Sequence, residues 1–261
     1  MRYVFLLGLA LRKSLTMAMQ YRWDFVLSAV LSLLWTATGL VPFYVAFHDR
    51  PPVEGWTYES ALVVVAVFTM LRAVLDGAVN PSLLTVVDQI RMGTFDFVLL
   101  KPADAQFLVS TTKFDVFRVV DVFAGIGLGT LAFVRMGRAP SAWGVLAALV
   151  MLGAATVVLY SIWILVISAA FWVVKVDNLA YLFSSIFDFA RWPVTVFKGV
   201  WRILFTFVIP VGIMTTYPAE ALLGTLTPGL FVGTLVGAVL FSSVARFVWT
   251  RALGHYTSAS S

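Results

Sequence analysis

Residues 143–174 read WGVLAALVMLGAATVVLYSIWILVISAAFWVV, a run without a charged side chain. A helix of about 20 apolar residues crosses the hydrocarbon layer of a bilayer. This run is longer, so it predicts a spanning helix that tilts or extends beyond the bilayer. The whole chain is similar in character, with 61% hydrophobic and 12% charged residues, whereas soluble domains carry about 25% charged residues. A soluble globule could not bury so much apolar surface.

Five more apolar stretches of spanning length accompany this run, and polar, glycine or proline residues separate them. The six predicted spans are residues 24–47, 58–79, 114–134, 143–174, 200–216 and 228–249. The sequence therefore predicts an all-α integral membrane protein with a six-helix domain over residues 24–250. The serine-containing tail, residues 251–261, is predicted to be disordered.

Residues 1–23 form an apolar segment that basic residues interrupt too early for a span. Polar or small residues recur every fourth position, at Gly8, Arg12, Thr16 and Gln20. This spacing predicts an amphipathic helix that lies in the membrane interface. A signal peptide is the alternative, but no small-residue cleavage site follows the short apolar run.

Two further segments are apolar yet carry charges. Residues 80–113 follow a predicted helix break at Asn80–Pro81 and are too charged to span. We expect a short amphipathic helix there, ending near Gly93, and another turn before Pro102. Residues 179–198 contain Asp188, Arg191 and Lys198. As a span they would make seven helices and separate the termini, so we place them at the cytoplasmic interface.

The loop of residues 217–227 contains Pro218 and Glu220 and precedes the last predicted span. Its apolar character predicts a short helix that dips into the outer leaflet.

Basic residues cluster in the segments that lie on the same side of the membrane as the amino terminus. They are Arg2, Arg12, Lys13, Arg22, Arg91, Lys101, Lys113, Lys175, Arg191, Lys198 and Arg251. The opposite loops carry few, so the positive-inside rule predicts that both termini are cytoplasmic.

The residue types exclude several kinds of chemistry. The chain has no cysteine, so disulfides, thiol catalysis and cysteine-bound metals are excluded. His48 and His255 stand far apart in the chain, in polar segments, and we expect neither a metal site nor a catalytic residue. No phosphate-binding loop occurs. The net charge of +5 is not gathered into a face that would bind nucleic acid.

Charged residues within predicted spans are few. Arg72 and Asp76 stand four residues apart, and Arg118 and Asp121 three residues apart, so each pair can neutralise itself on one helix face. The second pair is either a polar contact to a substrate or partner helix, or a structural anchor near the cytoplasmic headgroups, which we favour. A continuous relay of carboxylates is missing, which argues against a proton- or sodium-coupled transporter.

The segment 90–102 reads IRMGTFDFVLLKP, in which a glycine precedes a Leu-Leu-basic-Pro string. Together with the layout of spans, it resembles the cytoplasmic loop between the second and third helices of ABC-2-type permeases, in the bacterial branch of about 260 residues. The string FARWP at 189–193, then Arg202, Ile209–Pro210 and the loop Pro218–Gly224 are similar to that branch in order and spacing. The resemblance covers nearly the whole chain.

This resemblance implies an amino-terminal interfacial helix, six spans and a re-entrant loop before the last. It also implies a pair of permeases, identical or different, in a bacterial cytoplasmic (inner) membrane. Two cytoplasmic ABC ATPase subunits would bind ATP and Mg²⁺, so this chain itself would need no cofactor. The residues implied to dock into the ATPase are Asp88, Arg91, Gly93, Asp96, Lys101 and Pro102.

The family pattern is not followed everywhere. Asp104, Ala105 and Gln106 stand where a Ser/Pro-type turn is expected, which leaves the precise docking residues open. The function so implied is that of an exporter permease. The alternative is a membrane protein that does not transport, either an assembly scaffold or a lipid-modifying protein. Co-purification with a soluble ATPase would separate these possibilities.

Overall fold

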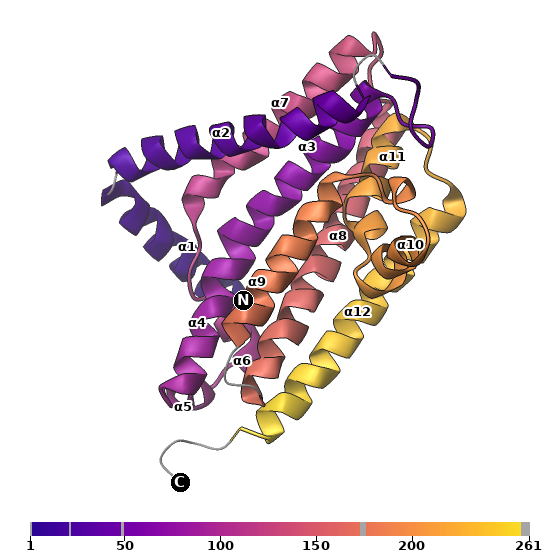
Figure 1. Ribbon diagram of the computed structural model, residues 1–261. Coiled ribbons are helices and arrows are strands. Elements are labelled where there is room, and N and C mark those ends of the chain that lie inside the picture. The colour runs from indigo at the N-terminus through magenta and orange to yellow at the C-terminus, as the bar shows by residue number, and fades with distance from the viewer. Residues whose placement is uncertain (1, 21, 48–49, 173–175, 257–261) are drawn as a thin grey trace.

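The computed structural model describes residues 2–20, 22–47, 50–172 and 176–256, and every regular element in those ranges is a helix (Figure 1). The amino-terminal half contains α1 (Arg2–Gln20), α2 (Arg22–Phe47), α3 (Tyr58–Val74), η1 (Leu75–Val79), α4 (Asn80–Arg91), α5 (Asp96–Leu99), α6 (Ala105–Ser110), η2 (Val116–Arg118) and α7 (Val119–Arg135). The carboxyl-terminal half contains α8 (Ala142–Ser168), η3 (Ala169–Phe171), α9 (Val176–Phe187), η4 (Asp188–Arg191), η5 (Val194–Val196), α10 (Val200–Ile203), η6 (Leu204–Val208), η7 (Gly212–Thr216), α11 (Tyr217–Leu223) and α12 (Pro228–Gly254).

Five helical segments in the described ranges are long and apolar enough to cross a bilayer. They are Trp23–Phe47, Tyr58–Arg91, Val116–Arg135, Ala142–Phe171 and Pro228–Gly254. The third candidate begins with η2 and the fourth ends with η3, so each contains a short 3₁₀ turn. These segments confirm the prediction of an all-α integral membrane protein.

The central helix is α8 (Ala142–Ser168), which begins one residue before position 143 and contains most of the uncharged run. Its own apolar residues face all sides, a pattern typical of a core helix or a membrane span. One part of its surface is buried in the bundle, while Trp143, Leu146 and Leu149 are exposed. It contacts α3, α4, α9, α11 and α12. The run that indicates the fold class therefore forms the middle of the bundle.

Helices α3 and α7 pack side by side in opposite directions (Figure 1). A Cβ atom at Gly77, in η1, would lie 3.1 Å from Cβ of Arg118, the last residue of η2 before α7. At the other end of the pair, Gly129 faces Ala66. We call the end of the bundle formed by residues 92–115 the basal end, and the end formed by residues 50–57, 136–141 and 224–227 the distal end.

The second span is longer than predicted, because the expected break at Asn80–Pro81 does not occur. Helix α3 continues through η1, a π-helical turn, into α4 and ends at Arg91. Pro81 lies in the first turn of α4. The wider π turn before it means that the helix does not require a backbone hydrogen bond from residue 81, which proline could not donate. The prediction of a break is wrong, and the first part of segment 80–113 is a rigid extension of the span.

Residues 179–198 were expected to lie at the cytoplasmic interface, and this placement is wrong. The indole Nε1 of Trp56 donates to Thr195 Oγ1 at 2.9 Å, and Nζ of Lys198 lies 3.1 Å from Glu54 Oε1. Trp56 and Glu54 belong to the distal end, opposite the segment 80–113. Lys198 is therefore at the other end of the bundle from the basal loops.

The opposite end of the same segment lies near the basal end, where α9 contacts α4 and α8. Midway, the ring of Phe187 lies 5.3 Å from that of Phe68 on α3. Residues 176–198 thus run along the bundle from one end to the other and provide its fifth crossing. Asp188 and Arg191 suggested an interfacial position, but they bind partners inside the bundle instead.

The predicted fifth span, residues 200–216, is a bent pair of helices. Segments Val200–Val208 and Gly212–Leu223 meet at 67°, at a break that contains Pro210, which has no backbone N–H to donate. Lys198 precedes the pair at the distal end. At its other end, Ala221 is also distal, since a Cβ atom on Gly144 would lie 2.8 Å from its carbonyl oxygen.

Because both ends of the pair are distal, we read it as a re-entrant hairpin and not as a crossing. It starts at residue 200, whereas the sequence predicted a dip only at 217–227. The number of crossings remains six, with the fifth reassigned to residues 176–198. The last helix, α12, then returns to the basal end.

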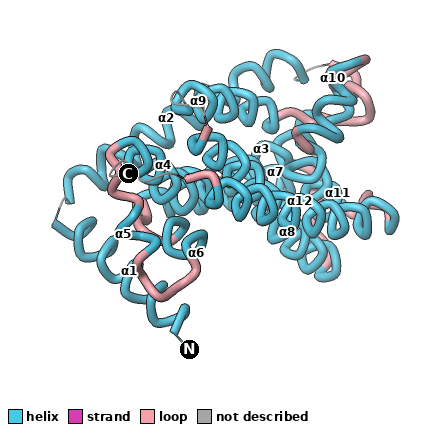
Figure 2. The backbone as a smooth tube through the Cα atoms, turned by 90° about the horizontal axis from the view of Figure 1, so that it is seen from below, coloured by secondary structure: helices cyan, strands magenta, loops and turns pink. Residues whose placement is uncertain are grey.

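The structure tests the predictions for the two ends of the chain only in part. Helix α12 continues to Gly254, so residues 251–254 of the predicted tail are helical, and residues 257–261 lie outside the described part of the chain. Helix α1 lies at the basal end beside α6, as Figure 2 shows in a view from below. The ring centroids of Tyr3 and Phe107 are 4.7 Å apart. An interfacial position for residues 1–23 remains a prediction.

Two glycines of α7 provide a test of the α3–α7 contact. A Cβ atom at Gly125 would lie 2.5 Å from Met70 Cγ and 2.8 Å from the Ala66 carbonyl oxygen, whereas one at Gly127 would meet nothing within 4 Å. We expect Gly125→Ala to destabilise the protein by about 1–3 kcal/mol through overpacking. Gly127→Ala should be neutral or stabilising, because alanine favours helix over glycine by about 1 kcal/mol. Thermal unfolding in detergent measures both, and equal melting temperatures would contradict the close approach.

Candidate functional site

The basal end presents a protruding tip formed by residues 91–102. Helix α4 ends at Arg91, and Gly93 follows with φ 69°, a left-handed conformation that favours glycine. The short helix α5 then leads to Pro102. This is the helix end that the sequence predicted at Gly93. Of the residues expected to dock into an ATPase, the structure gathers all but Asp88 on this tip, and Asp88 lies one turn before it on α4.

The exposure of these residues is uneven. Asp88, Arg91, Lys101 and Pro102 are exposed, whereas Asp96 is half-buried. Burial raises the pKa of the nearby Tyr256 hydroxyl, and the Asp96 carboxylate raises it further. Asp96 therefore faces the bundle, and the remaining docking candidates surround the tip.

Large apolar side chains also project from the tip, and the sequence reasoning missed them. Met92 is 67% exposed, Phe97 67% and Leu100 78%. Phe95 and Val98 are buried between these positions, so α5 is amphipathic and its outer face is apolar. Phe95 and Phe97 are two residues apart, so on a helix they face different sides, and this could have indicated that Phe97 points outward. A helix this short, however, shows no clear periodicity in its sequence.

Aromatic rings fix the tip to the bundle. The ring of the buried Phe95 lies 5.6 Å from Phe171 at the end of η3, 6.5 Å from Trp249 on α12 and 5.3 Å from Tyr256. These edge-to-face contacts are favourable beyond the apolar area that they bury. A displacement of the tip therefore acts directly on the basal ends of the fourth and sixth crossings.

Asp104 provides a second attachment. Its Oδ1 accepts from the N–H of Phe107 at 3.0 Å and so caps α6, while its Oδ2 accepts from Arg246 Nη2 on α12 at 2.6 Å. The hydrogen bond from Arg246 holds the pKa of Asp104 below its usual value. Arg246 also donates to Gln106 Oε1 at 2.8 Å. The residues that depart from the family pattern thus join the basal segment to the last helix.

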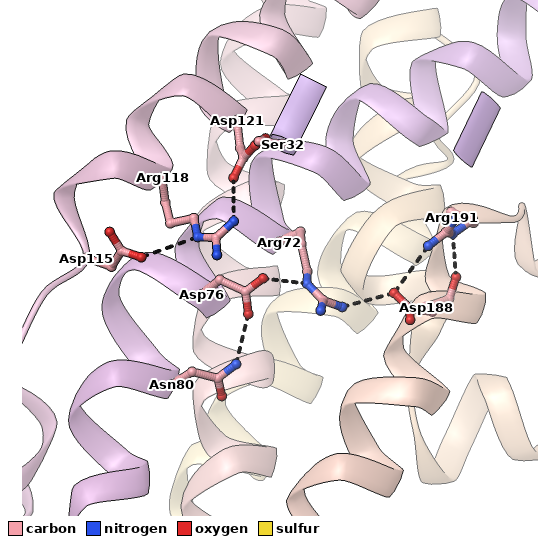
Figure 3. Close-up of polar contacts among 9 residues, drawn as sticks. All are labelled: Ser32, Arg72, Asp76, Asn80, Asp115, Arg118, Asp121, Asp188 and Arg191. Carbon is pink, nitrogen blue, oxygen red and sulfur yellow. Dashed lines mark hydrogen bonds and ion pairs between the residues drawn. The ribbon is translucent and has the colours of Figure 1, made fainter. Parts of the chain in front are cut away.

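A network of charged residues lies deeper in the bundle (Figure 3). Nε of Arg72 is 2.7 Å from Asp76 Oδ2, the pair expected from the sequence, and its Nη1 is 2.9 Å from Asp188 Oδ1. Asp188 also binds Arg191 Nη2 at 3.2 Å. Asn80 donates to the second oxygen of Asp76 at 2.9 Å. The network joins the second crossing to the fifth.

The expected pair of Arg118 and Asp121 is present in a second group. Arg118 Nη1 lies 3.6 Å from Asp121 Oδ2, and Arg118 Nε lies 3.4 Å from Asp115 Oδ2. Ser32 on α2 donates to Asp121. Figure 3 shows the two groups as neighbours on facing helices. Each charge in them has an opposite partner, as charges in an apolar bundle require.

The described residues contain no group of three or more His, Asp or Glu side chains placed to hold a metal ion. The arrangement at the basal end consists of an exposed apolar patch with charges around it. Exposed patches of this kind mark contacts with other proteins, membranes or ligands.

The central position of Arg72 leads to a stability prediction. Arg72→Met leaves Asp76 and Asp188 without this cation. Because these side chains are only partly buried, the cost should be about 1–3 kcal/mol, below that of a fully buried pair. Arg72→Lys keeps the charge but loses the planar fork that reaches both carboxylates, so its loss should be smaller. Arg135→Met, an exposed arginine at the end of α7, is the control. The melting temperature in detergent should be highest for the control Arg135→Met, lower for Arg72→Lys and lowest for Arg72→Met. If Arg72→Met melts at the same temperature as the control, the network does not stabilise the fold.

A model of the family described as ABC-2 family transporter protein matches residues 33–260 of the chain. The matched range begins within α2 and includes the basal tip, the charge network and the re-entrant hairpin. Helix α1 lies before it. No curated protein and no solved structure matches the chain.

Proposed function

The chain belongs to the ABC-2 family of transporter proteins, and we propose that it is the permease subunit of an exporter powered by a separate ABC ATPase. Membership makes it the membrane component of an ABC transporter, a component that is not itself catalytic. The resemblance seen in residues 90–102 is thereby confirmed. Outward transport, ATP and Mg²⁺ held by the ATPase, and a second permease that pairs with this one belong to the proposal.

The observation that carries the proposal is the continuity between the tip and the second crossing. Residues Tyr58–Arg91 form one helical segment, which at about 1.5 Å per residue extends roughly 50 Å. A displacement at Arg91 would move this segment as a lever, because the helix has no flexible joint before Gly93. The same displacement would reach α8 and α12 through Phe95.

The chemistry of the tip suits a protein partner. Apolar Met92, Phe97 and Leu100 form its centre, and Arg91 and Lys101 lie beside them. Interfaces between proteins commonly have an apolar centre with a polar rim. We infer that the apolar residues contribute most of the affinity for the ATPase, and that the charges select the orientation.

We propose that the basal end is cytoplasmic. After reassignment of Lys198 to the distal end, basic residues still favour the basal end, where Arg91, Lys101, Lys113, Arg246 and Arg251 lie. The positive-inside rule then supports cytoplasmic termini in a bacterial inner membrane. The distal hairpin would face the outside.

Single cysteines test this orientation cleanly, because the chain has no cysteine of its own. Ala139→Cys, in the loop between α7 and α8, should react with an impermeant maleimide added to intact cells. Met92→Cys at the exposed tip should react only after the cells are opened. Labelling of Met92→Cys from outside would reverse the proposed orientation.

The docking surface is tested by Phe97→Ala combined with Leu100→Ala. Both side chains project outward, so insertion and melting temperature should be unchanged, while affinity for the ATPase should fall by about tenfold or more, since an interface anchor contributes about 2 kcal/mol. Phe123→Ala with Leu131→Ala, two exposed positions on α7, is the matched control. Co-purification with the ATPase measures the effect.

Charge reversal at Arg91 together with Asp96 should also weaken the complex or uncouple hydrolysis from transport. Because Asp96 faces Tyr256, that variant requires a check of its melting temperature. If both tip variants bind the ATPase normally and transport normally, the docking surface lies elsewhere.

A further inference from the structure

A small cavity lies between α1 and the basal segment. Its volume is about 290 Å³, and residues from α1, α4, α5, α6 and the adjoining loops line it. Leu6 and Leu9 of α1 and Leu108 of α6 form apolar parts of the wall. Figure 2 shows α1 beside α5 and α6 at this end of the molecule. The cavity lies outside the charge network and shares Val98 and Lys101 with the tip.

Two lysines from different segments line the same cavity. Lys13 comes from α1 and Lys101 from the loop after α5, and both are exposed. The lining contains no acidic residue. Among the described residues, neither ammonium group forms an ion pair. Two cations at one opening, with no acidic side chain in the lining, attract an anion from outside the chain.

The surroundings indicate what kind of anion fits. The amide of Gln89 adds a hydrogen-bond donor to the lining, and the leucines provide an apolar wall next to the cations. Helix α1 also exposes Val4, Phe5 and Met19, which favours contact with the acyl region of a bilayer. A ligand with a negative head and an apolar chain satisfies both parts of the cavity, whereas a soluble phosphate would use only the cations.

We propose that this cavity binds an anionic phospholipid from the leaflet at the basal end. The phosphate would lie between Lys13 and Lys101, and part of an acyl chain would follow Leu6, Leu9 and Leu108. Basic pockets between helices at the cytoplasmic side of a membrane suit such headgroups. That this leaflet is the cytoplasmic one rests on the proposed function. The bound lipid would join α1 to the basal segment and so hold the segment that leads into the tip.

The full-length chain in detergent tests the proposal without an ATPase. Native mass spectrometry during titration with phosphatidylglycerol or phosphatidylcholine gives the affinity for each lipid. We expect phosphatidylglycerol to bind more tightly. Lys13→Gln or Lys101→Gln should each weaken it about fivefold, and the double variant about 25-fold. Lys13→Arg with Lys101→Arg should keep the preference, because the charges remain.

A matched control is Arg135→Gln with Arg138→Gln, which removes the same charge at the distal end and should leave phosphatidylglycerol binding unchanged. Equal binding of the two lipids, or a double lysine variant that binds as the original chain does, would overturn the site. Competition by millimolar inorganic phosphate would identify a site for soluble phosphate and overturn the lipid assignment. Failure of ATPase binding would leave these results intact, and a reversed orientation would only change the leaflet.

Discussion

The contact between Arg72 and two carboxylates determines how the bundle closes. Arg72 projects from the second crossing and binds Asp76 on its own helix and Asp188 on the fifth. A charge in an apolar bundle is costly unless an opposite charge meets it. The fifth crossing therefore cannot slide along α3 without separating Asp188 from Arg72. Arg191, which binds Asp188 and lies 5.1 Å over the ring of Phe68, strengthens the same register.

This register has consequences at both ends of the molecule. At the distal end it brings Thr195 to Trp56 and Lys198 to Glu54, so the chain must turn back and form the re-entrant hairpin there. At the basal end it leaves α3 and α4 free to continue as one helix beyond the network. The tip is therefore rigidly connected to a helix that the charges hold in place. Under the proposed function, an ATPase that displaces the tip would act on this helix and its charged contacts.

The sequence predicts those features that depend on neighbours along the chain. Gly93 ends its helix because the left-handed conformation is a local property. The uncharged run that begins at Trp143 forms a helix long and apolar enough to span a bilayer, because its composition permits little else. The predictions that are wrong depend on distant partners. Asp188 and Arg191 resemble interfacial charges until Arg72 is seen beside them, and Pro81 resembles a break until the π turn before it is known.

The candidate site follows the same division. Its place in the chain was predictable from the string before Pro102, but the outward direction of Phe97 and Leu100 follows from the burial of Phe95 against α12. The role of Asp104 depends on Arg246, which is 142 residues away. The resemblance to the family loop therefore identified the segment and most of its charges, and missed the apolar side chains that form the centre of its surface.

The central claim is that the basal tip contacts an ABC ATPase. The most direct measurement places a photo-crosslinking amino acid at position 97, and in a second protein at position 139, and identifies the adducts formed in native membranes by mass spectrometry. The account predicts an adduct with an ATP-binding ABC subunit at position 97 and none at position 139. The yield of the adduct at position 97 should change when ATP is added. An ATPase adduct at position 139, or its absence at position 97 in membranes that contain the assembled transporter, would contradict the account.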